Sequence, residues 1–234
     1  MIVRVRRYDP AVDRRPRWQA YAVEARPMMS VLDALFWILE SLDPTLAFRY
    51  SCRAGMCGSC AMVINGREGL ACQRRLERLR GPVSVEPLRS LPVTKDLLVD
   101  LGPFFEKYRA VDPFYVGETG SLIGAAPEPA VVPPGDPVRG VINRQIDCIS
   151  CGACYSACPV VGIVPEFLGP AALNRAYAVA ADTRDSAGLE RLRRVAADGG
   201  VFGCHSVGNC VTACPVGVNP LLSIQLLRKG AVHR

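Results

Sequence analysis

The sequence predicts an α+β protein of two modules, a mixed module of strands and one helix followed by an all-helical module. The eleven cysteines of the 234-residue chain fall into two groups, four between residues 52 and 72 and seven between 148 and 214. Strand-like alternation of hydrophobic residues occurs in the first module, and the later segments have helical periodicity. We therefore expect one domain over residues 1–95 and a second over 96–234.

The first module contains the elements of a β-grasp fold. Residues 2–8 alternate as a strand does, and residues 17–24 form a second candidate strand. A helix is expected from Ser30, where the sequence SVLD has the pattern of a capping box. The Asn-Gly pair at 65–66 predicts a type I′ hairpin, and VSVEP at 83–87 is expected to be the closing strand.

The second module is expected to be helical. The Pro/Gly-rich segment 124–140 ends the cysteine-free stretch between the two groups of cysteines. Pro103 is expected to kink or interrupt the first helix. The candidate helices cover residues 94–111, 171–182, 186–197 and 220–230.

Charge and hydropathy exclude some function classes. The net charge is +6, and basic residues gather in runs at 4–7, 14–17 and 74–80. Such runs favour a solvated or partner-facing surface over nucleic-acid binding. No apolar run approaches the roughly 18 residues of a membrane span, and the first residues resemble neither a signal nor a transit peptide. We expect a bacterial cytoplasmic protein, or one on a membrane face open to the cytoplasm.

The cysteine count favours metal–sulfur ligation. Eleven thiols cannot all pair, and a reducing compartment disfavours disulfides. Only two histidines are present, so mixed Cys/His zinc sites are disfavoured too. The mean hydropathy of +0.17 is high for a soluble chain and suggests contacts with partner subunits, or else ordinary core burial.

The first group of cysteines has the spacing of a plant-type 2Fe–2S cluster. Four residues, then two, then eleven separate its members. Gly55 and Gly58 can take positive φ and let backbone N–H groups approach the sulfurs. The Asn-Gly hairpin brings the last cysteine of the group back to the loop that carries the other three. The four predicted ligands are Cys52, Cys57, Cys60 and Cys72.

The second group has the spacing of a bacterial two-cluster protein, in which the fourth cysteine of each run serves the other cluster. This exchange predicts a 4Fe–4S cluster on four cysteines and leaves three for another cluster. Val207 occupies the place of the missing thiolate. The 4Fe–4S ligands are Cys148, Cys151, Cys154 and Cys214, and the remaining three are Cys158, Cys204 and Cys210.

Three thiolates and a valine favour a 3Fe–4S cluster. The alternative is a 4Fe–4S cluster with water or hydroxide on one iron, which a buried Val207 would disfavour. The fold class is then an N-terminal β-grasp plant-type ferredoxin domain followed by an all-helical bacterial dicluster ferredoxin domain.

These motifs resemble the iron–sulfur subunit of succinate dehydrogenase and fumarate reductase. The resemblance rests on CRAGMCGSC, CISCGACYSACP and CHSVGNCVTACPVGVNP, in that order over nearly the whole chain. It implies a complex with a flavoprotein carrying FAD and a transmembrane anchor, often with haem b, on the cytoplasmic face of a bacterial inner membrane. Electrons would pass through 2Fe–2S, 4Fe–4S and 3Fe–4S clusters to quinone. Succinate oxidation is the expected direction, and fumarate reduction is the alternative.

The resemblance also implies a quinone pocket beside the last cluster. It would include Pro159, His205 and Val207, while Ile163 stands where many ubiquinone-linked members have tryptophan. Both ubiquinone and menaquinone therefore remain open. His205 could instead bond a backbone carbonyl, and His233 is expected to have no role.

The 2Fe–2S domain must have a higher potential than the roughly −400 mV of plant-type ferredoxins. Hydrogen bonds to sulfur and the charge of Arg53 are the candidate causes, and a salt bridge from Arg53 to the flavoprotein is the alternative. Outside this family, a freestanding ferredoxin or a structural metal-binding module stays possible. Thiol- or heterodisulfide-linked relatives would need a further cysteine-rich domain.

Overall fold

The structure is a computed structural model that describes residues 1–117, 131–133 and 135–233. Part of the Pro/Gly-rich segment predicted at 124–140 lies outside these residues. The chain forms two compact units. Unit 1 consists of Met1–Phe104, Ile149–Ala157 and Ala213–Pro215, and unit 2 consists of Phe105–Cys148, Cys158–Thr212 and Val216–Arg234.

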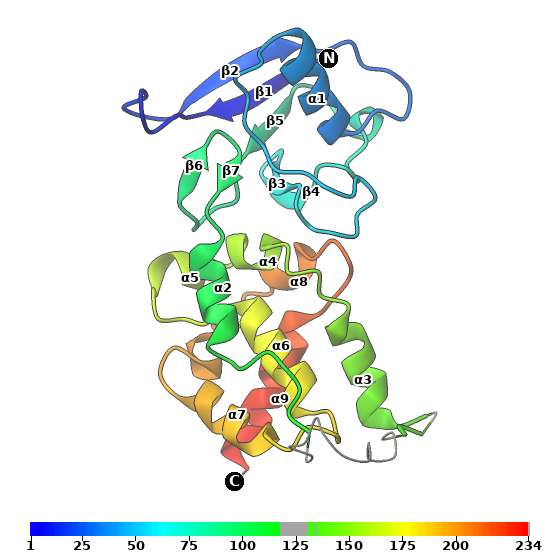
Figure 1. Ribbon diagram of the computed structural model, residues 1–234, viewed down its shortest axis with the longest axis vertical. Helices are drawn as coiled ribbons and strands as arrows, with labels where there is room; N and C mark the ends of the chain where they lie inside the picture. The colour runs from blue at the N-terminus through cyan, green and yellow to red at the C-terminus, as the bar shows by residue number, and fades with distance from the viewer. Residues whose placement is uncertain (118–130, 134, 234) are drawn as a thin grey trace, which may run out of the picture. The chain divides into compact units, whose positions relative to one another are not determined.

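A five-stranded sheet and one helix form the body of unit 1 (Figure 1). The strand order is β2-β1-β5-β3-β4, with β1 and β5 parallel and the other pairs antiparallel. The helix α1 packs on this sheet, and their side chains share one hydrophobic core. The elements are β1 (Ile2–Arg7), β2 (Arg17–Ala22), α1 (Val31–Ser41), β3 (Ala61–Ile64), β4 (Arg67–Leu70) and β5 (Val83–Glu86).

Local sequence explains these elements, and the β-grasp prediction is confirmed. Val3 and Val5 alternate into the core and pair with Val83 and Val85 of β5. Ser30 caps α1 reciprocally with the side chain of residue 33, as the capping box predicts. The turn between β3 and β4 has positive φ at both central residues, +48° and +78°, as a type I′ turn requires.

The helix predicted over 94–111 is shorter than expected. A two-stranded hairpin of β6 (Val93–Lys95) and β7 (Leu98–Val99) replaces its first part, and α2 covers only Gly102–Arg109. The hairpin turns at Asp96, whose φ is +48° and whose carboxylate accepts hydrogen bonds from the backbone of residues 8 and 47. Pro103 lies in the first turn of α2, where no N–H is needed, and so it begins the helix instead of interrupting it.

Unit 2 is built from helices. The longer ones are α3 (Pro137–Ile146), α6 (Pro170–Ala180), α7 (Gly188–Ala196) and α9 (Pro220–Val232), and α6 packs against both α7 and α9 (Figure 1). The predicted helices at 171–182, 186–197 and 220–230 are therefore confirmed within a few residues. The short elements are η1 (Leu76–Arg78) and α4 (Ala153–Ser156) in unit 1, and α5 (Pro159–Ile163), η2 (Val201–Gly203) and α8 (Asn209–Thr212) in unit 2.

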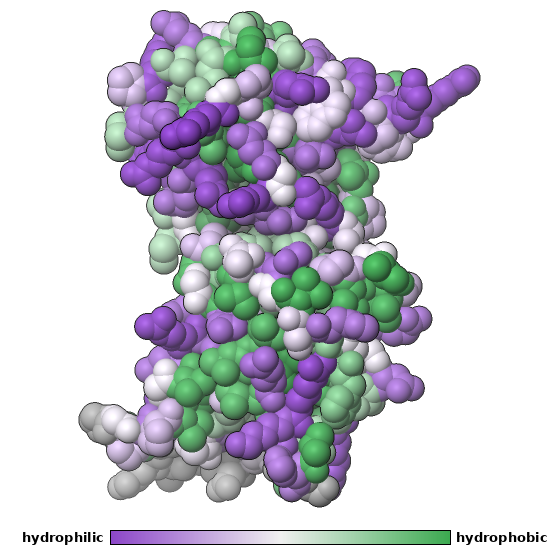
Figure 2. Space-filling view, turned by 180° about the vertical axis from the view of Figure 1, so that it is seen from behind, coloured by the Kyte–Doolittle hydropathy of each residue, from purple (hydrophilic) through white to green (hydrophobic). Residues whose placement is uncertain are grey.

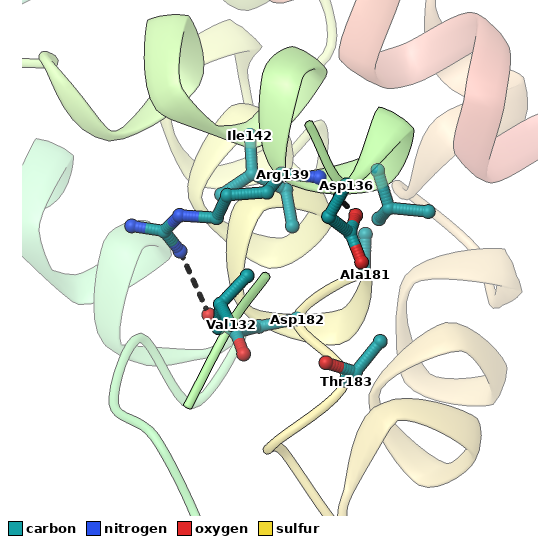
Figure 3. Close-up of a pocket in the computed structure, with 8 residues that line it drawn as sticks. Val132, Asp136, Arg139, Ile142, Ala181, Asp182 and Thr183 are labelled. Atoms are coloured by element: carbon teal, nitrogen blue, oxygen red, sulfur yellow. Dashed lines mark hydrogen bonds and ion pairs between the residues drawn. The ribbon is translucent and has the colours of Figure 1, made fainter. Parts of the chain in front are cut away.

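The helix α3 was not predicted, because it begins inside the Pro/Gly-rich segment. Asp136 caps it by accepting the N–H of Arg139 (2.8 Å), and a proline occupies its first position. The Arg139 guanidinium donates to Asp182 at the end of α6 (3.1 Å), beside a cavity of about 10 Å³ (Figure 3). This volume suits about one water molecule, and the contact holds α3 to the segment that follows α6.

Two buried polar groups organise the core of unit 2. The Arg191 guanidinium pairs with Asp185 (3.3 Å) and donates to three carbonyls of residues 111–114. Asn174 of α6 donates to the Gln145 carbonyl (3.0 Å) and accepts from Ser223 of α9 (2.8 Å). Within the described ranges, no helix is long and apolar enough to cross a membrane.

Candidate metal centres

All eleven cysteines lie among the described residues, and none is in a disulfide. The first predicted set lies entirely in unit 1, in the loop before β3 and directly after β4. The N–H of Ala71 donates to the carbonyl of Cys60 (3.0 Å), which aligns the two arms that carry Cys60 and Cys72. The structure thus brings the four predicted 2Fe–2S ligands to one loop region.

Backbone N–H groups in this loop point at sulfur. The amides of Ala54, Met56 and Cys57 lie 3.4, 3.3 and 3.3 Å from the Cys52 Sγ. The amide of Ser59 lies 3.5 Å from the Cys57 Sγ. A ring of N–H donors around thiolates fits an anionic iron–sulfur cluster, whose charge these dipoles stabilise.

Left-handed backbone conformations produce this arrangement. Gly55 and Gly58 have φ of +79° and +72°, as predicted, and Arg53 also has a positive φ of +57°. Residues in the left-handed region reverse the direction of the following N–H and make an anion-binding concavity. Arg53 adopts it without the freedom of glycine, which indicates that the surrounding loop holds its backbone there.

The environments of the thiols differ. A hydrogen bond from the Ser59 side chain is the main cause that lowers the pKa of Cys57 to about 6. Burial raises the pKa of Cys60 to about 12. Cluster binding requires thiolates, so assembly at Cys60 must release a proton that the buried apo site holds.

The Arg53 guanidinium is engaged within its own chain. It pairs with Asp33 of α1 (3.0 Å) and lies over the ring of Phe36, 5.1 Å from its centroid. Asp33 partly neutralises the charge of Arg53, while N–H groups contact the sulfurs directly. Hydrogen bonding to sulfur is therefore the stronger of the two causes expected to raise the potential.

The second predicted set is divided between the units. Cys151, Cys154 and Cys214 belong to unit 1, whereas Cys148 is the last residue of the first segment of unit 2. Ser150 and Gly152 have φ of +51° and +78°, so this loop also carries left-handed residues between its cysteines. Residues with left-handed backbone conformations therefore occur between the cysteines of both predicted clusters.

A buried carboxylate holds the second loop on the sheet. Glu68 of β4, which is 8% exposed, accepts a hydrogen bond from the Ser156 hydroxyl (3.0 Å). The same hydroxyl accepts the N–H of Arg89 (2.8 Å). These bonds fix α4, which begins between Cys151 and Cys154. Sequence reasoning missed them because Ser156 is 88 residues from Glu68 and 67 residues from Arg89.

The third predicted set lies entirely in unit 2 and lines one pocket. The pocket has a volume of about 20 Å³, on the same measure as the cavity beside Arg139, and it opens to solvent. Burial, followed by the charges of Cys158 and Cys204, raises the pKa of Cys210 to about 11, so the three thiols are electrostatic neighbours. The pocket also contains three of the four residues predicted to form the quinone site. These are Pro159, His205 and Val207.

One expectation for this pocket needs correction, and another stays a prediction. Ile163, at the end of α5, is 78% exposed and is not among the residues that line the pocket, so its quinone contact is untested. Val207 was expected to be buried, but it is 56% exposed in this chain because it lies in the open loop between Cys204 and α8. The argument from burial against water as a fourth ligand is therefore lost, and the choice of a 3Fe–4S cluster over a 4Fe–4S cluster with water stays a prediction.

Arg228 of α9 supports the loop of the third set and was not anticipated from the sequence. Its guanidinium donates to the carbonyl of Val201 (2.8 Å), to the carbonyl of Cys204 and to the Ser206 hydroxyl (3.3 Å). These three hydrogen bonds fix the backbone on both sides of the predicted ligand Cys204. An arginine eight residues after the start of a helical pattern gave no signal beyond a solvated charge.

Exposed apolar side chains occur in both units. Figure 2 shows hydrophobic residues grouped on the face of the helical unit that this view presents. The exposed large hydrophobic residues of the chain include Met56 beside the first set, and Ile163, Phe202 and Val207 near the third. Contiguous apolar patches mark contacts with other proteins, whereas single exposed hydrophobic residues are ordinary.

Comparison with known proteins agrees with this fold and these loops. Residues 2–106 match the family of 2Fe-2S iron-sulfur cluster binding domains, and residues 144–218 match the 4Fe-4S dicluster domain family. The protein is therefore an iron–sulfur electron-transfer protein with a 2Fe–2S domain and a helical 4Fe–4S domain.

Whole-chain relatives define the family more narrowly. The chain is 42% identical to a fumarate reductase iron-sulfur subunit of Mycobacterium tuberculosis, over 96% of this chain and 90% of the relative. It is 37% identical to a succinate dehydrogenase iron-sulfur subunit of Paracoccus denitrificans, over 97% and 86%. A chain in the structure of the Mycobacterium smegmatis Sdh1 complex in the apo form superposes with a TM-score of 0.81 at 26% identity, covering 100% of this chain and 95% of that chain.

The chain belongs to the family of succinate dehydrogenase and fumarate reductase iron–sulfur subunits, and so to the oxidoreductases. Iron–sulfur clusters supply one-electron transfer. The chain's own contribution is to hold the thiolates, to direct N–H donors at sulfur and to fix the loops through Glu68 and Arg228.

Proposed function

We propose that this chain is the electron-transfer subunit of a succinate dehydrogenase, which carries electrons from the FAD of a flavoprotein through three clusters to membrane quinone. One observation carries the proposal. Ten of the eleven cysteines lie in three segments, 52–60, 148–158 and 204–214, and each segment contains left-handed residues, among them Arg53, Ser150 and Ser206. The dicarboxylate chemistry belongs to the flavoprotein.

The proposed ligand sets follow the cysteine spacing and the exchange between the two runs. Cys52, Cys57, Cys60 and Cys72 hold the 2Fe–2S cluster, and Cys148, Cys151, Cys154 and Cys214 hold the 4Fe–4S cluster. Cys158, Cys204 and Cys210 hold a 3Fe–4S cluster, supported by their common pocket. The domain boundary predicted between residues 95 and 96 lies within the β6–β7 hairpin, and the first segment of unit 1 continues to Phe104.

The proposed quinone site lies at the pocket of the third set. Pro159, His205 and Val207 line that pocket and are exposed, so a quinone could approach them in this chain. Ile163 is proposed as an outer contact, since it lies at the other end of the short helix that begins at Pro159.

The proposed partners are a flavoprotein with FAD and a transmembrane anchor that carries haem b and part of the quinone site. The family membership and the exposed apolar residues of both units support two separate contacts. We place the chain on the cytoplasmic face of a bacterial inner membrane, attached through the anchor.

Fumarate reduction is the second candidate. Several relatives are named fumarate reductase subunits, among them the Mycobacterium tuberculosis protein at 42% and a Haemophilus influenzae protein at 38% identity. The ligand sets serve either direction, because a chain of one-electron carriers conducts both ways.

Affinity purification in mild detergent under anaerobic conditions tests the function. We expect a flavoprotein and a membrane protein to co-purify, with about nine irons per copy of this chain, since clusters of two, four and three irons sum to that number. A chain that purifies alone with about four irons, or chiefly with zinc, would refute the proposal. Succinate oxidation and viologen-driven fumarate reduction, measured on the same preparation, then distinguish the two directions.

A further inference from the structure

Two predicted cluster loops of unit 1 approach each other closely at Gly58. This residue lies between Cys57 and Cys60, and a methyl group on it would be 2.6 Å from the Cβ of Cys151 and 3.0 Å from its Cα. It would also be 3.2 Å from the carbonyl oxygen of Ile149. The crowding atoms are backbone and Cβ atoms, so no flexible side chain can move aside.

The other glycines with positive φ near this loop are less constrained. At Gly55, with φ of +79°, the three atoms nearest to a methyl group would all belong to the flexible side chain of Gln73. At Gly66, with φ of +78°, nothing lies within 4 Å. A left-handed backbone alone therefore explains these two glycines, whereas Gly58 also requires the absence of a side chain.

The loop that Gly58 contacts is held in place independently. Ile149 and Cys151 pack against the hydrophobic core of unit 1. Ser156, five residues after Cys151, is bonded to Glu68 and to the N–H of Arg89 (3.0 and 2.8 Å). A side chain at position 58 would have to push the two loops apart against these contacts.

We propose that Gly58 is a positioning residue that sets the separation of the 2Fe–2S and 4Fe–4S clusters and provides the contact for electron transfer between them. The proposal rests on the ligand sets given under the proposed function. The step moves one electron from the reduced first centre to the oxidised second centre, with no bond made or broken and no proton moved. Tunnelling falls steeply with distance and is faster through packed atoms than across a gap, so the Gly58–Cys151 contact controls this rate.

The test compares Gly58→Ala with Gly55→Ala and Gly66→Ala in the purified complex. All three variants put a methyl group on a residue with positive φ, and only Gly58→Ala crowds Cys151. Iron content and redox titration establish that both clusters are present at unchanged potentials. After rapid reduction, freeze-quenched electron paramagnetic resonance measures electron arrival at the 4Fe–4S cluster. We expect Gly58→Ala to be severalfold slower than both controls, with weaker magnetic interaction between the two reduced clusters.

Equal rates and equal magnetic interaction in Gly58→Ala and Gly55→Ala would overturn the proposal. If Gly58→Ala fails to assemble, Ser156→Ala loosens the same loop without adding atoms and should weaken the interaction to a smaller extent. A wild-type complex with both clusters reduced and no magnetic interaction between them would also overturn it. Each of these outcomes differs from failure of the proposed function, in which the clusters or the quinone-linked activity would be absent.

Discussion

At the scale of single residues, the hydrogen bonds around Cys57 are the clearest control of the 2Fe–2S potential. The Ser59 side chain and its N–H both contact this sulfur, the latter at 3.5 Å. Donors to sulfur stabilise the reduced, more negative cluster and so raise its potential. The nearby arginine acts less directly, because Arg53 already pairs with Asp33.

Ser59→Ala should therefore lower the 2Fe–2S potential. Loss of one typical hydrogen bond costs about 1 kcal/mol, which corresponds to on the order of 50 mV for one electron. Potentiometric titration followed by electron paramagnetic resonance measures the shift. Arg53→Gln is the matched comparison, and its shift should be smaller. A larger shift in Arg53→Gln would mean that charge, and not hydrogen bonding, sets the potential.

Val207 provides a second residue-scale test, of the cluster type. It replaces a cysteine of the two-two-three spacing and lines the pocket of Cys158, Cys204 and Cys210. Val207→Cys should let the cluster take up a fourth iron, lower its potential and reduce turnover without loss of assembly. Oxidised 3Fe–4S clusters are paramagnetic and oxidised 4Fe–4S clusters of this kind are silent, so the variant should lose the signal of the air-oxidised wild type. A silent wild type with full iron would mean four irons and a non-protein ligand.

At the scale of secondary-structure elements, Arg7 of β1 connects three parts of unit 1. It is 4% exposed, donates to Asp96 between β6 and β7 (2.9 Å), to Tyr21 of β2 (2.6 Å) and to Asp43 after α1. The run at residues 4–7 was expected to be a basic surface, and Arg7 departs from that expectation. Burial alone would raise the pKa of Asp43, but hydrogen bonds from Thr45, Tyr21 and Arg7 hold it well below its usual range. Asp43 is therefore ionised at neutral pH.

Asp43→Asn should consequently destabilise unit 1 by about 3 kcal/mol, the lower end of the cost of breaking a buried ion pair, since Asp96 still pairs with Arg7. Asp13→Asn is the control. Its carboxylate pairs with Arg17, whose side chain is 52% exposed, and such pairs contribute less than about 1 kcal/mol. Anaerobic urea unfolding of both variants, followed by circular dichroism, gives the difference. Similar urea midpoints for the two variants would show that the hydrogen bonds and ion pairs of Arg7 contribute little to the stability of unit 1.

A helix or strand can be predicted from the sequence when the interactions that determine it are local. The capping box at Ser30 and the Asn-Gly turn act within a few residues, and both were predicted and found. The β6–β7 hairpin replaced a predicted helix because Asp96 bonds to groups 88 and 49 residues away. The helix α3 was missed because proline and glycine mark loops in general, whereas here Asp136 and the following proline start a helix.

At the scale of the whole molecule, the cysteine spacing predicted the sequence of domains, and the matches at residues 2–106 and 144–218 confirm their kinds. The spacing could not show that Ile149–Ala157 and Ala213–Pro215 join the compact unit of residues 1–104. That grouping depends on contacts such as Ser156 with Glu68 and Cys151 with Gly58, which no local pattern encodes. The ligand sets themselves remain predictions that metal analysis must test.

The proposed delivery of electrons to quinone can be separated from the earlier electron-transfer steps at His205. This side chain is exposed and lines the pocket of the third set together with Pro159 and Val207. If His205 donates a hydrogen bond to quinone, His205→Ala should reduce quinone-linked turnover on the order of tenfold, as for loss of about 1.4 kcal/mol. Succinate oxidation with an artificial dye that accepts electrons upstream should change little.

His233 is the matched control, because it lies at the C-terminal end of α9 and outside the residues that line the pocket. His233→Ala should leave both activities at the wild-type level. Equal losses of quinone-linked and dye-linked activity in His205→Ala would instead identify a structural histidine that supports the loop between Cys204 and Cys210. The electron paramagnetic resonance signal of the third cluster decides this point, since a structural defect would diminish the signal, whereas loss of a quinone contact would leave its intensity unchanged.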